Sequence, residues 1–169
     1  MGDATTTHAE AMAKAKAPTA AILQEAASEG SFALSVSGLR HHFQDVCTTR
    51  LKGVGLTPAL LYFMLYVGKH EGCTQRQMID ALCTDVGYST RSVAKLIEAG
   101  YLEQRPNPAD GRSNLLYLTA EGKGAYAYGR QILDEWNEGA LACLSQAERE
   151  QLIGLLGRVI VGLGCDIVR

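Results

Sequence analysis

Catalytic signatures are missing from this 169-residue chain. It contains no glycine-rich phosphate loop, no GxSxG or HExxH motif and no zinc-finger spacing of cysteine and histidine. Its carboxylates are scattered, and several stand at expected helix starts, where the helix dipole accounts for them. We therefore predict that the protein is not an enzyme and that it uses no cofactor and no metal ion.

Long apolar runs are missing too. The apolar run Leu60–Val67 is far shorter than the roughly 20 residues with which a helix crosses a bilayer. The alanine-rich start is interrupted by Lys14 and Lys16, so it lacks the apolar core of a signal peptide. We expect a cytoplasmic protein with no membrane partner, and its 47% hydrophobic content is enough for a packed core.

Paired cysteines and an excess of positive charge are the remaining absences. The five cysteines include no CxxC pair, and thiols in the cytoplasm are normally reduced. The net charge is −2, and residues 57–124 hold seven Lys and Arg against seven Asp and Glu. This balance excludes a protein that coats nucleic acid through bulk charge. Any affinity for DNA must therefore come from the local placement of a few cations.

What the sequence does contain is an ordered set of elements between residues 74 and 118. Thr74 and Gln77 have the spacing of a capping box, which predicts that a short helix begins there. A polar break follows, and either Thr84 or Asp85 can cap a second helix. The break is only a few residues long, so the two helices form a helix-turn-helix.

The second of these helices has two different faces. We expect it to end at Gly100, where a left-handed backbone conformation costs little. Its predicted inner face is apolar and consists of Val93, Leu96 and Ile97. Its predicted outer face is cationic and hydroxylated and consists of Tyr88, Arg91, Ser92 and Lys95. A helix with such an outer face can enter the major groove of DNA.

A short hairpin is predicted after this helix. Residues 102–105 suit one strand and residues 114–118 a return strand, and the turn between them contains two prolines and a glycine. Arg112 falls near the tip of the hairpin, and we expect it to form a charge pair with Asp110. A hairpin directly after a helix-turn-helix predicts a winged helix.

These elements resemble the MarR family of bacterial transcription regulators. The matching motifs are Asp85-Val86-Gly87 with Thr90-Arg91, Leu96-Ile97-Glu98-Ala99-Gly100-Tyr101-Leu102, Arg105-Pro106-Asn107-Pro108-x-Asp110-x-Arg112, and Leu118-Thr119-x-x-Gly122. The close match covers about residues 56–123. The resemblance implies a homodimeric transcription regulator that binds double-stranded DNA at a near-palindromic operator and acts as a repressor.

Further helices are predicted on both sides of the winged region. Before it, residues 31–51 keep an amphipathic period, and residues 59–69 are apolar nearly all round, which places that helix at the centre of the core. After it, one helix is expected from Ala120 to about Leu144 and a last helix is expected to end near Val168.

The last helix needs a partner surface. It opens with a capping box at Ser145 and Glu148 and then repeats apolar residues at helical spacing: Leu152, Ile153, Leu156, Val159, Ile160 and Leu163. Because this stripe is too long and apolar for a lone helix, we predict a homodimer.

The expected fold is mainly α with a small two-stranded β wing: a winged helix-turn-helix flanked by N- and C-terminal dimerisation helices. Its parts are an N-terminal extension, an N-terminal dimerisation helix and loop, the DNA-binding domain and the C-terminal dimerisation helices, at residues 1–30, 31–56, 57–122 and 123–169.

The resemblance also assigns roles to side chains. Contacts with DNA are expected from the recognition helix and the wing: Tyr88, Ser89, Thr90, Arg91, Ser92, Lys95 and Arg112. The sequence departs from the family at Gly111, where a basic residue is usual, and at Ala94-Lys95, where Asp-Arg is frequent. These departures and the neutral charge leave an alternative open, a winged helix used for protein contact without sequence-specific DNA binding.

The family further implies a small effector, an aromatic or phenolic acid, at the junction between the dimerisation helices and the winged domain. That junction would draw on His41, His42, Tyr62 and Tyr66, with an ordinary packed hinge as the alternative. Some members sense oxidants through a cysteine of the first dimerisation helix. Cys47 lies towards the end of that helix, which leaves a cysteine-based redox-sensing regulator as another alternative.

Overall fold

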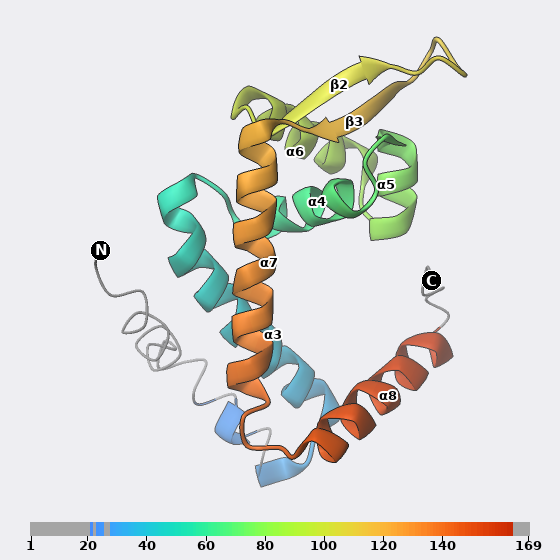
Figure 1. Cartoon of the computed structure of the whole chain (residues 1–169). Helices are drawn as coiled ribbons and strands as arrows, with labels where there is room; N and C mark the ends of the chain where they lie inside the picture. Colours follow the sequence, from blue (N-terminus) through green and yellow to red (C-terminus); the bar gives the residue numbers. More distant parts are fainter. Residues whose placement is uncertain (1–20, 22, 26–27, 164–169) are drawn as a thin grey trace. The chain divides into compact units, whose positions relative to one another are not determined.

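The computed structural model describes residues 21, 23–25 and 28–163 of the chain. In chain order its elements are α3 (Phe32–Leu51), the 3-10 turn η1 (Lys52–Val54), α4 (Pro58–Lys69), β1 (Cys73–Thr74), α5 (Gln75–Leu82), α6 (Val86–Glu98), β2 (Leu102–Pro106), β3 (Asn114–Leu118), α7 (Ala120–Ala140) and α8 (Gln146–Gly162). Figure 1 shows these elements along the chain. A mainly helical fold with a β wing is confirmed. Most of the predicted N-terminal extension, and the predicted end of the last helix at Val168, lie outside the described residues.

The described chain forms two units, which are treated separately below. The first runs to Leu133 and the second begins at Asp134, so the boundary falls inside α7. The first unit contains the helix-turn-helix and the wing, and the second contains the end of α7 together with α8.

The described helices from α3 to α6, and α8, begin at capped residues. The Ser31 hydroxyl caps α3, and Thr57 caps α4 with Pro58 in the first turn. Both predicted capping boxes are present, at the starts of α5 and α8. Of the two candidates before α6, Asp85 is the cap, because its carboxylate accepts a hydrogen bond of 2.8 Å from the backbone N–H of Tyr88.

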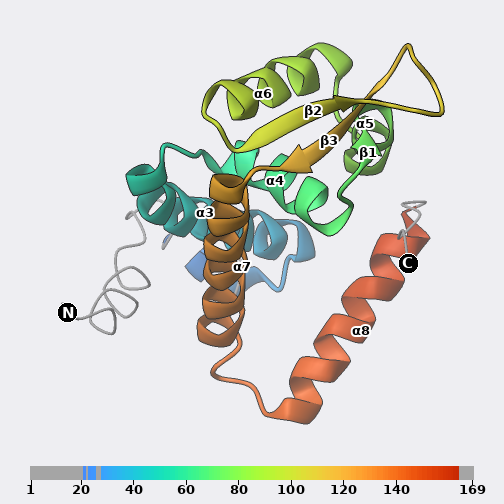
Figure 2. The same cartoon turned by 45° about the horizontal axis from the view of Figure 1, so that its top comes forward.

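The sheet has three strands instead of the two predicted. Its order is β1-β3-β2, and both pairings are antiparallel. β2 and β3 form the expected hairpin, with Gln104 opposite Leu116, while Cys73 and Thr74 add a short strand on the other side of β3. Figure 2 shows the hairpin beside α6, with its loop extending beyond the helices.

The core of the first unit is built around α4, as predicted. Leu61, Phe63, Met64 and Val67 of this helix are all buried. The first half of α7 packs close to α4, because Gly129 leaves room for the Leu61 side chain: a Cβ there would lie 2.5 Å from Leu61 Cδ1.

The second unit differs from its prediction in one respect. α7 ends at Ala140 and not near Leu144, and a turn follows in which the Leu144 N–H donates to the Leu141 carbonyl at 3.0 Å. α8 has no buried residue in its described length.

No single helix within the described ranges is long and apolar enough to span a membrane. Only the bent combination of Phe32–Val54 with Pro58–Lys69, which turns by 78°, meets the requirements of length and composition together.

Candidate DNA-binding surface

Helix α6 packs against α4, α5 and β2. Val93 and Leu96 are buried, as the predicted inner face requires. Ser89 and Ser92 are buried as well, at 0% and 4% exposure, so the expectation that Ser92 lies on the outer face is wrong. Ser89 is satisfied internally by a 2.7 Å hydrogen bond with the Thr84 hydroxyl. A serine whose hydroxyl is hydrogen-bonded inside the protein can be buried between two helices with little loss of stability. The polarity of the residue therefore does not show, from sequence alone, that it is exposed.

Three of the four residues predicted for the outer face of α6 are exposed: Tyr88, Arg91 and Lys95. Thr90 is exposed as well. The Tyr88 ring also packs against Phe63 of α4, with 5.8 Å between ring centroids, which holds the tyrosine at the start of the helix. Within the described part of the chain, Arg91 and Lys95 form no ion pair, so both charges are available to a partner.

The loop at the tip of the wing is closed by its own hydrogen bonds. The backbone N–H of Asn107 donates to the Ser113 carbonyl at 3.1 Å, and the Asn107 side chain donates to the Ser113 hydroxyl at 2.9 Å. The Asp110 carboxylate accepts from the backbone N–H of Arg112 at 3.1 Å. Asp110 therefore serves the turn through the backbone, and the predicted charge pair with the Arg112 side chain is wrong. The Arg112 side chain remains exposed.

Arg105 has a different role from Arg112. Its guanidinium pairs with Glu103 on the same strand and lies over the Tyr117 ring of the neighbouring strand, 4.4 Å from the ring centroid. These contacts join β2 to β3, and they pair the charge of Arg105 with groups of the wing itself. Arg112 is thus the wing cation that is left for an external partner.

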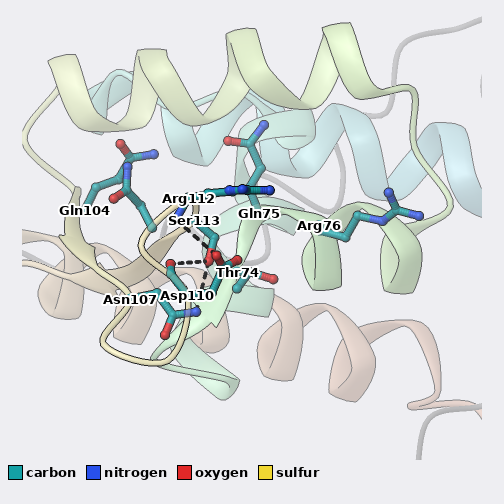
Figure 3. A pocket seen from close by; sticks show the side chains of 9 residues that line it. Thr74, Gln75, Arg76, Gln104, Asn107, Asp110, Arg112 and Ser113 are labelled. Atoms are coloured by element: carbon teal, nitrogen blue, oxygen red, sulfur yellow. Dashed lines mark hydrogen bonds between the residues drawn. The ribbon is translucent and has the colours of Figure 1, made fainter.

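A polar groove of about 540 Å³ lies between the start of α5 and the wing (Figure 3). Its lining comes from both elements and consists of Thr74, Gln75, Arg76, Gln104, Asn107, Asp110, Arg112, Ser113 and Asn114. Two guanidinium groups and several amides provide many hydrogen-bond donors here, which is the chemistry that binds a phosphate backbone.

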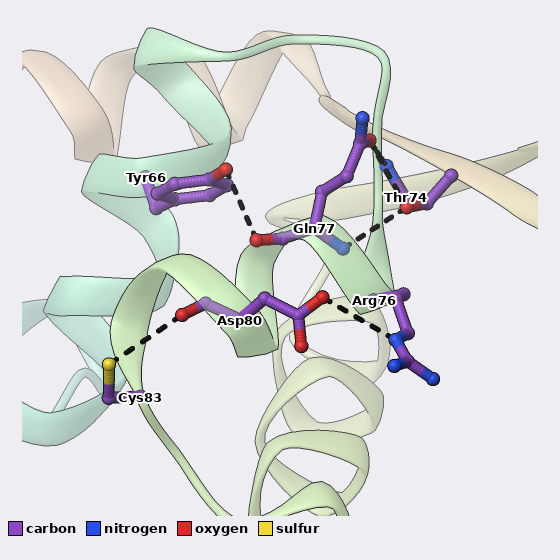
Figure 4. A network of polar contacts seen from close by, with 6 residues as sticks. All are labelled: Tyr66, Thr74, Arg76, Gln77, Asp80 and Cys83. Atoms are coloured by element: carbon purple, nitrogen blue, oxygen red, sulfur yellow. Dashed lines mark hydrogen bonds and ion pairs between the residues drawn. The ribbon is translucent and has the colours of Figure 1, made fainter. Parts of the chain in front are cut away.

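Polar contacts hold α5 in place on this surface (Figure 4). The Tyr66 hydroxyl donates to the Gln77 carbonyl at 3.4 Å, and the Cys83 thiol donates to the Asp80 carbonyl at 3.6 Å. Cys83 closes the helix in a left-handed conformation, with φ of 49°. Arg76 forms an ion pair of 3.4 Å with Asp80 one turn later. Both partners are largely exposed, so this pair adds little stability.

Sequence reasoning missed Gln75. Its side-chain amide donates a 2.7 Å hydrogen bond to the Thr90 hydroxyl on α6. Within α5, Gln75 is simply the polar residue after the cap, and nothing in the local pattern relates it to a residue fifteen positions later. Only the packing of α5 against α6 brings the two side chains together.

The four residues proposed for an effector face different neighbours. Burial raises the pKa of Tyr62, Cys47 raises it further, and Arg40 lowers it, so Tyr62 faces α3. Tyr66 faces α5, and its ring centroid lies 4.6 Å from that of His70. His41 is half-buried and donates from Nδ1 to the Ser37 carbonyl at 2.8 Å, and His42 is half-buried beside it.

The cysteine chemistry of α3 is that of a buried thiol. Cys47 is fully buried. Burial raises the pKa of its thiol to about 11, although the nearby Arg50 lowers it. The thiol is therefore protonated near neutral pH, and redox sensing at Cys47 gains no support, because the thiolate is the reactive form.

Comparisons with known proteins agree with this geometry. A family model described as the MarR family matches residues 54–113. The HTH-type transcriptional regulator BilQ of Clostridium symbiosum is 35% identical over 131 residues, which cover 78% of this chain and 91% of that protein.

Solved structures show the same fold. A probable transcriptional regulator from Pseudomonas aeruginosa has 26% sequence identity and a TM-score of 0.68, covering 78% of this chain and 98% of its own. An uncharacterised SlyA-like transcription regulator from Listeria monocytogenes has 18% identity and a TM-score of 0.74, covering 80% and 91%. With the helix-turn-helix, the wing and the extent of the match to a curated relative in agreement, the chain belongs to the MarR family of transcriptional regulators.

Proposed function

We propose that this protein is a cytoplasmic, homodimeric repressor that binds a near-palindromic operator and leaves it when a small aromatic acid binds. The observation that carries the DNA-binding part is the exposed cationic face of α6. Arg91 and Lys95 extend from it, opposite the buried Val93 and Leu96. A helix held from below in this way can enter a major groove with its first turns.

The contacts divide by chemistry. Tyr88 and Arg91 lie in the first half of α6 and are assigned to the bases, whereas Lys95 and the wing residue Arg112 are assigned to phosphates. Ser89, whose hydroxyl is bonded to Thr84, and Ser92, at 4% exposure, present little surface to a partner and are not assigned to DNA here. The groove between α5 and the wing would take the sugar-phosphate backbone.

A second copy of the chain would cover two apolar faces, one in each unit. On α3 the exposed apolar residues are Phe32, Val36 and Leu39. On α8 they are Ile153, Leu155, Val159, Ile160, Val161 and Leu163. Faces of this kind are typical of subunit interfaces. The assignment keeps residues 31–56 and 123–169 as dimerisation segments around a DNA-binding domain at residues 57–122.

DNA binding is tested by fluorescence anisotropy with genomic fragments that the protein itself recovers. The wild type is expected to bind a recovered fragment far more tightly than a scrambled duplex of equal length. Equal and weak binding to both would favour the protein-contact alternative, which the seven-to-seven charge balance of residues 57–124 supports.

Members of the family are regulators, in agreement with the sequence-based prediction that the chain is not an enzyme.

The effector is tested with the protein–DNA complex. An aromatic acid that binds beside α4 should raise the melting temperature of the protein and release the DNA, because a ligand that prefers one dimer geometry shifts DNA affinity by the same coupling free energy. Because Tyr62 faces α3 and Tyr66 faces α5, the variants Tyr62→Ala, Tyr66→Ala and His42→Ala separate an acid bound on the α3 side of α4 from one bound on its α5 side. An identified ligand that is insensitive to all three changes would place the pocket elsewhere.

A further inference from the structure

The hydrogen bonds around Thr90 determine the orientation of the Gln75 amide. The Thr90 hydroxyl donates its only hydrogen to the Val86 carbonyl, at 2.8 Å. The same oxygen lies 2.7 Å from the Gln75 amide, so Thr90 must be the acceptor in that bond and Gln75 the donor. The amide NH₂ therefore faces Thr90. The amide oxygen, Oε1, has no hydrogen-bond partner among the described residues.

We propose that Gln75, a residue of the first helix of the helix-turn-helix, determines specificity at one base pair of each operator half-site by reading an adenine. This inference rests on the proposed DNA-binding function. Oε1 can accept from the adenine N6 amino group. The second hydrogen of the NH₂, which Thr90 does not use, can donate to N7. Paired acceptor and donor groups of this kind distinguish adenine from the other bases in the major groove.

Two further observations show that Gln75 belongs to the surface proposed to bind DNA. Gln75 lines the groove between α5 and the wing, as do Arg76 and Arg112 (Figure 3). Thr90, which holds the amide, is itself exposed on the outer face of the recognition helix. Gln75 thus lies between cations suited to phosphates and a helix suited to the major groove.

The hydrogen bond to Thr90 holds the Gln75 side-chain amide in one orientation before DNA binds. A free glutamine loses side-chain entropy when it docks on a base, and a glutamine already held in one rotamer loses less. Thr90 is then a positioning residue for Gln75, and its own hydroxyl is already occupied by the two bonds. The pair extends base reading from α6 to α5.

The test is a set of operator duplexes that carry every single base-pair change in one half-site, titrated against four proteins. Gln75→Met keeps the side-chain volume and removes both amide groups. Thr90→Val keeps the shape of the threonine and removes the hydroxyl. The double variant completes a thermodynamic cycle. Gln104→Met is the matched control, because it makes the same change on the wing side of the groove, and no hydrogen bond from the Gln104 side chain to α6 is found in the described part of the chain.

Gln75→Met should lower discrimination about tenfold at one position, where adenine is preferred, and leave the other positions unchanged. Thr90→Val should reduce discrimination at the same position, and the double variant should lose no more than Gln75→Met alone. Gln104→Met should keep every base preference, even if it lowers affinity evenly.

The inference is overturned if Gln75→Met retains the wild-type preference profile, or if Gln75→Met and Thr90→Val act additively at different positions. Should Gln75→Met fail to fold, judged by circular dichroism, the Thr90→Val profile decides the question by the same criterion. Failure of the proposed function is seen separately, because the wild-type protein would then not distinguish operator from scrambled DNA.

Discussion

Neighbouring residues on α6 have very different exposure, and this controls what each can do. Arg91 and Lys95 are exposed one turn apart, while Ser92 between them is buried. The Arg91 guanidinium extends back along the first turn: a Cβ built on Gly87 would lie 3.4 Å from its Nη1 atom. Arg91 is thus the cation nearest the start of α6, and Lys95 lies one turn further along the helix.

Replacing Arg91 by Ala should cost on the order of 1–3 kcal/mol of binding free energy on the operator and relax preference at one position of each half-site. A guanidinium bonds a guanine edge through two donors, so Arg91→Lys should not restore the preference. Anisotropy titrations on operator and scrambled DNA measure both effects.

Lys95→Ala and Arg112→Ala serve as the comparison for Arg91→Ala. Each should weaken all sequences evenly and flatten the dependence of affinity on salt, because phosphate contacts carry little sequence information. If Arg91→Ala behaves as they do, Arg91 is a phosphate contact and base reading lies with its neighbours on α6.

The buried thiol of Cys47 predicts a dependence of stability on pH. Its pKa rises from an ordinary 9.0 to about 11 in the folded protein, mainly through burial. Below about pH 9 both states hold the proton. Between pH 9 and about 11 only the unfolded state releases it, so the contribution of the thiol to stability is lost as pH rises through this window, by up to roughly 2–3 kcal/mol.

Urea denaturation at pH 8 and pH 10.5 measures this loss, and Cys47→Ala is the control because it removes the titrating group. The variant should be less stable at pH 8 and should fall less steeply with pH than the wild type. Equal slopes for both proteins would mean that the thiol is not protected from solvent.

At the scale of elements, the start of α7 depends on a glycine without space for a side chain. A Cβ on Gly122 would lie 1.9 Å from the backbone carbonyl oxygen of Tyr101, whereas a Cβ on Gly124 would meet nothing within 4 Å. Thr119 adds to the junction, since its hydroxyl accepts from the Gly122 N–H at 2.9 Å and donates to the Gly100 carbonyl. The start of α7 therefore packs directly against the backbone of the turn between α6 and β2.

Gly122→Ala should destabilise the protein by about 1–3 kcal/mol, because the backbone has to move to admit the methyl group. Gly124→Ala in the same helix turn should instead stabilise it by up to about 1 kcal/mol through helix propensity. Thermal and urea unfolding of the two variants measure these opposite signs, and a similar change in both would show that the Gly122 contact is not tight.

The elements that the sequence predicted well are those with local signals. The capping boxes at Thr74 and Ser145 act within one turn, so their residues can be recognised directly. β1 was missed because two residues are too few to show a strand period, and its pairing partner lies more than forty residues away. α7 was drawn too long because the residues after Ala140 have good helix propensity, although the chain turns before the Ser145 cap.

The candidate site was predicted less completely than the fold. The charges on α6 could be identified from spacing, because exposed cations follow the helical period. The burial of Ser89 depends on Thr84 as a partner across the turn, and the contact of Gln75 with Thr90 depends on how two helices cross. Tertiary contacts of this kind leave no mark in a local pattern.

For the whole molecule, the exposed apolar face of α8 predicts association. Light scattering at micromolar concentration should give a mass close to twice 18.1 kDa. Ile160 is 43% exposed on α8, and Ile160→Asp would bury a charge without a partner at the interface, so it should produce monomer or aggregate. Leu156→Asp, on the same stripe, should do the same.

Gln151→Asp is the control, since it adds the same charge at an exposed polar position of α8 and should leave the dimer intact. A wild-type protein that remains monomeric at this concentration would contradict both the dimer and the near-palindromic operator, whose half-sites are expected about 10 base pairs apart.

The short pairing of β1 with β3 has a mechanical consequence. β1 ends at Thr74, and Thr74 caps α5, so strand, cap and helix are one continuous piece of backbone. β3 carries the wing, and its pairs Cys73–Leu116 and Thr74–Leu115 tie that wing to the start of the helix-turn-helix. A movement of the wing would therefore also move α5 and Gln75. In the proposed dimer each winged domain would therefore contact DNA as one rigid body. An effector would then change the distance between the two domains and leave the shape of each domain unchanged.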